Sequence, residues 1–211
     1  MARVNLVVGA FVVAASLPLA AEAAKVTYDF TGVADGGFGY TASTTTFFSG
    51  ATFDITAVGD TAGIHLLPAP PFFPGTFATT LTSMKITVSG VGTFHPVGPE
   101  YVFNVQSNKL GGFGSNFLGD FVYFFGPSQL GSYALATNLG PLAVGGLVPK
   151  SSYPYVLTDR GYLGFANISN ATFTSTVAVP EPATWTFFIV GFGLAGAVAR
   201  RKCATTISQQ R

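Results

Sequence analysis

The chain has 211 residues, enough for one domain of ordinary size with additional terminal segments. Charged residues make up only 9% of it and aromatic residues 14%, which excludes charge-driven disorder and favours a packed core. Between Ala24 and Val179 five basic residues stand against seven acidic ones, a net charge of −2. This region has no basic patch, so we expect no binding to nucleic acid.

The N-terminal segment, residues 1–23, has the pattern of an export signal. A single arginine precedes an apolar stretch, and Pro18 separates that stretch from a region of small residues. Ala21 and Ala23 have the small–x–small form that a signal peptidase requires, which predicts a mature N-terminus at Ala24. The alternative is a retained anchor or a buried first helix, but the stretch is short and Pro18 interrupts it.

Residues 24–179 are predicted to be built from strands. Apolar residues alternate with polar ones in short segments rich in Thr, Val, Phe and Tyr, a pattern typical of half-buried strands. The segment 121–125 is apolar throughout and is compatible with a strand buried on both faces. The strand-like segments are residues 26–30, 51–58, 82–88, 101–105, 161–168 and 171–177.

Glycine-rich turn signals separate these strands, and no part of the body has a helical apolar stripe. Short strands without a βαβ rhythm indicate a mostly β body, and we expect an antiparallel β-sandwich or jelly roll. Residues 66–75, LLPAPPFFPG, contain too much proline for a central strand and should form a long loop.

The body contains no motif that predicts catalysis or a metal site. Its histidines, His65 and His95, lack partners at ligand spacing, and the only cysteine of the chain, Cys203, lies outside the body. Its carboxylates are scattered singly, whereas glycoside hydrolysis needs two of them flanking one bond. No GxSxG motif supports a serine hydrolase. We therefore predict a protein that is not an enzyme and has no cofactor or metal ion.

A calcium site is a weaker alternative. This alternative needs the fold to gather Asp29, Asp35, Asp54 and Asp60 around Ca²⁺, which accepts oxygen ligands from several loops. The sequence has no DxDxDG-type run to support such a site.

The C-terminal segment, residues 180–211, combines a motif, an apolar run and a basic end. Residues 183–199 are without charge and as a helix would span roughly 25 Å. This is the lower limit for a bilayer core of about 30 Å. Trp185 lies at one edge of the run, where indoles favour the headgroup region. A basic cluster, which tends to stay on the cytoplasmic side, follows at the other edge. The cluster is Arg200, Arg201 and Lys202, and the basic tail is residues 200–211.

The motif itself precedes the apolar run. Pro180, Glu181 and Pro182, with Trp185, resemble the PEP-CTERM sorting signal of Gram-negative bacteria in its PEPxxWA variant, in which Thr186 replaces the usual Ala. The resemblance implies recognition by an exosortase, an integral-membrane cysteine transpeptidase. It also implies release to the cell surface or to the extracellular polysaccharide matrix.

Small residues in the apolar run suggest how that recognition works. Gly191, Ala195 and Ala199 lie on one helix face at i, i+4 spacing, a surface on which another helix can pack closely. We hypothesise that this face docks on the exosortase while the motif, residues 180–185, enters its catalytic site.

These observations favour an exported surface or matrix protein that is held transiently in the inner membrane. A carbohydrate-binding or adhesive β-sandwich is the alternative for the body, and a secreted hydrolase is the least favoured. Extracellular polysaccharide is a possible partner. Aromatic residues of the loop 66–75, if exposed together, would support the carbohydrate-binding alternative.

Overall fold

The structure is a computed structural model that describes residues 23–40, 45–69, 72–115, 119–148 and 155–178. Residues Ala23–Val179 form one compact unit. The expected signal peptide, apart from Ala23, and the expected sorting segment 180–211 lie outside the described residues. No helix in the described ranges is both long and apolar enough to cross a membrane.

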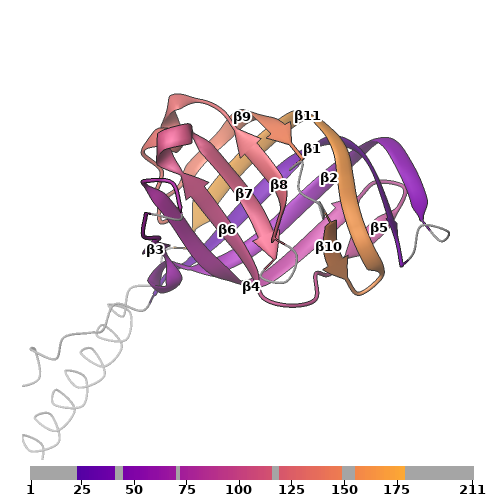
Figure 1. Ribbon diagram of the computed structural model, residues 1–211, viewed down its shortest axis with the longest axis horizontal. Helices are drawn as coiled ribbons and strands as arrows, with labels where there is room; N and C mark the ends of the chain where they lie inside the picture. The colour runs from indigo at the N-terminus through magenta and orange to yellow at the C-terminus, as the bar shows by residue number, and fades with distance from the viewer. Residues whose placement is uncertain (1–22, 41–44, 70–71, 116–118, 149–154, 179–211) are drawn as a thin grey trace, which may run out of the picture. The chain divides into compact units, whose positions relative to one another are not determined.

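Within these ranges the chain forms eleven strands and three short 3-10 helices (Figure 1). The strands are β1 (Lys25–Gly39), β2 (Thr46–Asp60), β3 (His65–Leu66), β4 (Thr76–Val88), β5 (Gly92–Phe94), β6 (Glu100–Val105), β7 (Leu110–Ser115), β8 (Gly119–Phe125), β9 (Leu139–Leu147), β10 (Tyr155–Thr158) and β11 (Gly161–Val177). The 3-10 helices are η3 (Thr61–Gly63), η4 (Gln106–Asn108) and η5 (Ser128–Gly131).

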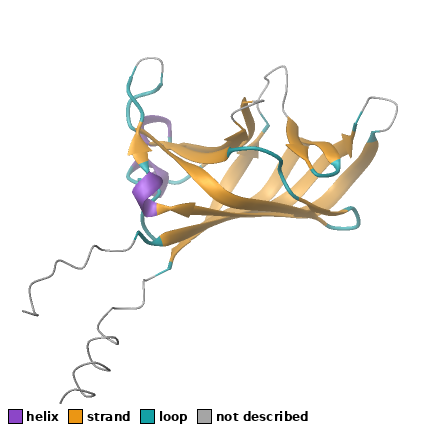
Figure 2. Cartoon of the chain, turned by 90° about the horizontal axis from the view of Figure 1, so that it is seen from below, coloured by secondary structure: helices purple, strands orange, loops and turns teal. Residues whose placement is uncertain are grey.

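The strands form one antiparallel sheet that closes on itself. The order is β1-β2-β4-β6-β7-β8-β9-β11-β10, and a further pairing of β1 with β11 joins the two sides of the sheet. The closed part is barrel-like and contains eight strands, while β3, β5 and β10 pair at its margins. The closed sheet wraps around one interior (Figures 1 and 2).

The mostly β, antiparallel body expected from the sequence is confirmed, but the two separate sheets of a sandwich are not what forms. Strand β4 pairs with β6 over residues 76–80 and with β2 over residues 81–88. Strand β9 pairs with β11 and then, from residue 145, with β8. Strands β4 and β9 therefore each pair with one neighbour along one part of their length and with a different neighbour along the rest. In this way they join the strands into one continuous sheet, as strands do at the corners of orthogonal packings.

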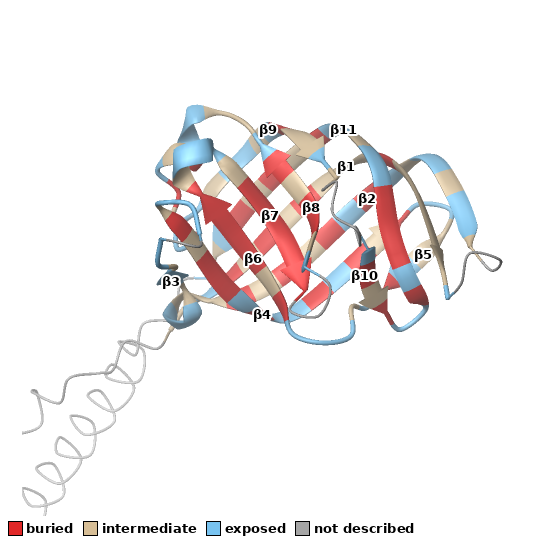
Figure 3. Ribbon diagram, viewed as in Figure 1, coloured by how far each residue is buried: buried red, intermediate tan, exposed pale blue. Residues whose placement is uncertain are grey.

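Alternating side chains fill the interior as the sequence pattern predicts. Phe53, Ile55 and Ala57 of β2 are buried, whereas Asp54 and Thr56 between them are not. Figure 3 shows this alternation along the strands. Phe30 lies at the centre of an aromatic core, with its ring centroid 5.3 Å from those of both Phe53 and Phe124.

The two ends of the described body lie side by side. Val26 pairs with Val177, and the Ala178 N–H donates to the Lys25 carbonyl at 2.8 Å. The Thr61 N–H donates to the Ala24 carbonyl at 2.9 Å, which fixes the start of β1 against η3. Among the described residues, every strand pairing and every core side chain lies between residues 25 and 177, so residues 24–178 hold the whole of the described sheet and its core.

Candidate functional site

A second apolar cluster lies on the outer face of β4, β6, β7 and β8, separate from the main core. Phe103 and Val105 of β6 are buried there, although their neighbours in sequence, Val102 and Asn104, point into the interior. Both faces of β6 are therefore covered. The partly buried members of the outer cluster are Leu67, Tyr101, Leu110 and Tyr123.

Glycines in β7 let the aromatic rings lie close to the sheet. Gly114 faces Tyr101 across the ladder, and Gly112 faces Phe103. A Cβ atom at Gly112 would lie 2.7 Å from Cζ of Phe103, and one at Gly114 would overlap the Tyr101 ring. Any larger residue would displace these rings, so the glycines let the aromatic floor lie close against β7.

A bulge in β8 puts a carboxylate at the edge of this floor. Gly114 pairs with Asp120 while Phe113 pairs with Val122, so Phe121 is an extra residue in the ladder. Without it, Asp120 and Tyr123 would point to opposite faces. With it, both point to the outer face.

Two tyrosines hold that carboxylate. The Tyr101 hydroxyl donates to Oδ1 of Asp120 at 2.6 Å, and the Tyr123 hydroxyl donates to Oδ2 at 2.9 Å. Burial, together with the hydrogen bond to Asp120 and its charge, raises the pKa of Tyr123 to about 12 and that of Tyr101 still further. Both tyrosines are therefore protonated donors at neutral pH. The Asp120 side chain thus has a fixed orientation, and its remaining lone pairs can accept hydrogen bonds from a ligand.

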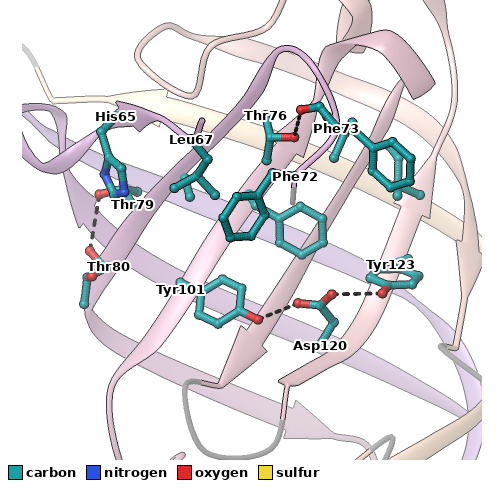
Figure 4. Close-up of a pocket in the computed structure, with 14 residues that line it drawn as sticks. His65, Leu67, Phe72, Phe73, Thr76, Thr79, Thr80, Tyr101, Asp120 and Tyr123 are labelled. Atoms are coloured by element: carbon teal, nitrogen blue, oxygen red, sulfur yellow. Dashed lines mark hydrogen bonds between the residues drawn. The ribbon is translucent and has the colours of Figure 1, made fainter. Parts of the chain in front are cut away.

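The proline-rich loop forms the opposite wall. Its ends are fixed by the Leu67 N–H, which donates to the Thr76 carbonyl at 2.8 Å, and by the Thr76 hydroxyl, which donates to the Phe73 carbonyl at 2.6 Å. Phe72 and Phe73 are 45% and 60% exposed. Figure 4 shows the row formed by Tyr101, Asp120 and Tyr123 together with Phe72 and Phe73.

Floor and wall enclose a groove of about 480 Å³, which we call the aromatic groove. It is within the size range of small-ligand sites, and it combines apolar rings with a few convergent polar groups. Its lining is His65, Leu67, Phe72, Phe73, Thr76, Ala78, Thr79, Thr80, Tyr101, Phe103, Val105, Leu110, Asp120 and Tyr123.

The structure brings some of the sequence-predicted residues to this groove. The loop 66–75 contributes its two phenylalanines, and His65 lies at the rim with its Nδ1 2.9 Å from the Gly63 carbonyl. His95 does not line the groove, and its backbone N–H donates to Oδ1 of Asp159. Among the described residues no group of His, Cys, Asp and Glu is arranged to hold a metal ion.

The four aspartates considered for calcium lie on two strands, Asp29 and Asp35 on β1 and Asp54 and Asp60 on β2. Asp60 caps η3, and Asp54 accepts from Thr56. Asp35 accepts from Ser49, Asn167 and the Gly50 N–H, hydrogen bonds that lower its pKa to about 2. Asp29 lies in β1, opposite Thr56.

The floor of the groove was not predicted from the sequence. Tyr101, Asp120 and Tyr123 come from two strands that are not adjacent in the sheet, and the bulge that aligns the last two leaves no sequence motif. One signal was available. The strand 101–105 carries Tyr101, Phe103 and Val105 on one face and Val102 with Asn104 on the other, so each face has apolar side chains to cover.

The residues of the predicted sorting machinery lie outside the described ranges. They are Pro180, Glu181, Pro182, Trp185, Gly191, Ala195, Ala199, Arg200, Arg201, Lys202 and the signal-peptidase residue Ala21. Ala23 lies just before β1 and is half-buried.

Comparison with known proteins adds one finding to this geometry. No curated protein and no solved structure matches the chain. A family model described as the PEP-CTERM protein-sorting motif matches residues 178–202, which begin one residue after β11 ends at Val177. The resemblance of this segment is thereby confirmed, and the chain carries a PEP-CTERM protein-sorting motif directly after its closed β sheet.

Proposed function

We propose that this is an exported, non-enzymatic protein of the cell surface or extracellular matrix. An exosortase processes it through the motif at residues 180–185. The observation that supports this proposal most directly is the match of the sorting motif to residues 178–202. Such a motif implies export and membrane-associated processing, and the expected signal peptide, residues 1–23, would supply the export step.

The sorting step follows from the chemistry of the segment. The prolines at 180 and 182 keep the backbone extended and unable to continue β11 as a central strand. Glu181 is the recognition contact between them. The apolar run 183–199 holds the precursor in the inner membrane, and the basic cluster that follows sets its orientation.

The experiment is a release assay in a host that contains the exosortase. We expect Glu181→Ala to leave uncleaved precursor in the inner membrane, with the signal peptide removed as usual, because the processing enzyme loses its polar contact. Thr186→Ala is the matched control, since it brings the segment closer to the PEPxxWA pattern and should be processed like the parent. Mass spectrometry of membrane and released fractions gives the result. Normal release of the Glu181 variant would make the tail a plain anchor.

The aromatic groove favours a second role, that of a ligand-binding module, for the body after release. Its described lining contributes a single carboxylate, Asp120, whereas glycoside hydrolysis needs two. This favours binding over hydrolysis. The binding role does not depend on the sorting mechanism, because every residue of the groove lies within the body.

A further inference from the structure

We propose that the aromatic groove binds a neutral polysaccharide, with sugar rings stacked on the aromatic floor and sugar hydroxyls donating hydrogen bonds to Asp120. This inference deepens the binding role proposed above and rests on it. It is argued from the donor and acceptor inventory of the groove, its charge and the placement of its rings.

The floor offers aromatic rings to a ligand with C–H groups on its faces. The Tyr101 and Phe103 rings approach the β7 glycines, 6.1 Å apart between centroids and tilted by 46°, and Tyr123 continues the row 5.9 Å from Phe103, edge to face with it. Aromatic faces carry partial negative charge and attract the weakly positive C–H groups of a sugar ring. The exposed rings of Phe72 and Phe73 supply apolar surface on the other side.

The polar part of the groove is rich in acceptors. The hydroxyl protons of Tyr101 and Tyr123 are already donated to Asp120, so the oxygens of all three side chains present lone pairs to a ligand. The Thr76 hydroxyl proton is donated to Phe73. The lining contains no lysine or arginine among the described residues. The groove therefore needs a ligand with many donors.

This inventory separates the candidate ligands. Every free sugar hydroxyl can donate, and it can rotate to suit the acceptor. A polypeptide carries as many carbonyl acceptors as N–H donors, and its carbonyls would find few partners here. A purely apolar ligand would remove water from the Asp120 carboxylate without replacing its hydrogen bonds, which is costly. A uronic acid polymer would place its carboxylates beside Asp120, and like charges repel. A neutral polysaccharide meets all of these conditions.

The test is affinity electrophoresis of residues 24–178 in native gels containing hydroxyethyl cellulose, glucomannan or dextran, each a neutral polymer. Matching gels contain polygalacturonate or alginate, and a gel without polymer gives the reference mobility. We expect retardation by at least one neutral polymer and none by the anionic ones. Retardation by the anionic polymers alone would overturn the neutral-ligand inference while leaving a binding module in place. Unchanged mobility in every gel would overturn both.

Variants locate the site. Asp120→Asn and Phe73→Ala should each lower affinity about tenfold or more, because one removes a charged acceptor and the other an aromatic wall. Asp54→Asn carries the same charge change on an exposed position of β2, and Phe47→Ala truncates a phenylalanine that is 80% exposed and away from the groove. Both controls should bind like the parent. Melting curves check that all four variants fold.

Two further outcomes contradict the proposal. If Asp120→Asn and Phe73→Ala bind as well as their controls, the polymer binds elsewhere on the body. If soluble poly-L-proline binds the groove and the neutral polymers do not, the occupant is an extended peptide. Neither result affects the sorting proposal, whose release assay depends on Glu181 and not on the groove.

Discussion

Glu100 is an acidic side chain in a place that disfavours its charge. It is 4% exposed at the start of β6, so its carboxylate is largely removed from water. Burial raises its pKa to about 7, and the side chain of Ser115, its partner in the β6–β7 register, offsets only part of this effect. Glu100 should therefore be largely protonated in the folded protein in mildly acidic solution.

This burial predicts that the body loses stability as the pH rises. The unfolded chain releases the Glu100 proton near pH 4.5 and the folded chain near pH 7. Between these values the folded state binds more protons, so the free energy of unfolding falls with rising pH and then levels off. Glu100→Gln should remove this fall. At pH 8 we expect the variant to be more stable than the parent by on the order of 2–3 kcal/mol, and at pH 4 nearly equal to it.

Urea unfolding of residues 24–178 at pH 4, 5.5 and 8 measures this difference. Asp54→Asn, the same kind of charge removal at an exposed carboxylate, serves as the control. An equal pH dependence in the parent and the Glu100 variant would show that the carboxylate is hydrated in solution.

At the scale of elements, the groove depends on two features of neighbouring strands. Strand β7 supplies glycines where rings from β6 approach the sheet closely, and β8 supplies the bulge that turns Asp120 outward. Neither the β7 glycines nor the bulge itself contributes an aromatic ring to the floor of the aromatic groove. The geometry of the site is thus set by residues that a ligand need not touch.

Gly114→Ala tests this dependence. The added Cβ would overlap the Tyr101 ring, so the ring must move and its hydrogen bond to Asp120 must break. We expect a loss of about 1–3 kcal/mol in the free energy of unfolding, as is usual for overpacking. The tyrosine pKa values should fall towards 10, as ultraviolet titration would show. Gly131→Ala is the control, because its Cβ would meet its nearest atoms at an ordinary 3.7 Å. Similar effects of both substitutions would contradict the role of Gly114.

The sequence predicts the long strands well and the groove poorly, for physical reasons. Alternation in β2, β4 and β11 reflects one buried face per strand, a local property that each segment carries by itself. Closure of the sheet depends on β4 and β9, each of which pairs with two different strands. The partner strands come from distant parts of the sequence, so the local pattern of β4 or β9 does not indicate the change of partner. The groove needs residues from three parts of the chain and a bulge with no motif. Only its proline-rich loop, residues 66–75, was recognisable in advance.

For the whole molecule, the start of the body, where signal-peptide cleavage is expected, lies beside its end, where the sorting motif begins. β1 begins at Lys25 and β11 ends at Val177, and the Ala178 N–H bonds to the Lys25 carbonyl. The sorting motif begins in the same short stretch, since its match starts at residue 178. Folding of the sheet therefore brings together two sites that are more than 150 residues apart in the sequence.

The start of β1 supports a definite N-terminus for the mature protein. The Ala24 N–H donates to the Thr61 hydroxyl at 3.0 Å, so cleavage before Ala24 would leave the new terminus next to that hydroxyl without loss of a strand residue. We expect Edman sequencing of the exported protein to begin at Ala24. Ala23→Leu should block the cut, because a large side chain does not fit the small-residue pocket of signal peptidase. Ala62→Leu, an exposed change in η3, is the control. A sequence beginning at Met1 would contradict the prediction.

The pairing of Val26 with Val177 also determines how the body responds to mechanical load. A force that separates the two ends acts across the β1–β11 ladder and opens its hydrogen bonds one after another, as in unzipping. A load applied between β8 and the C-terminal end of β11 instead passes through β9 and β11. It does not pull on the start of β1. A body held in this second way would keep the β1–β11 pairing closed under a tension that would open it if the chain were pulled by both ends.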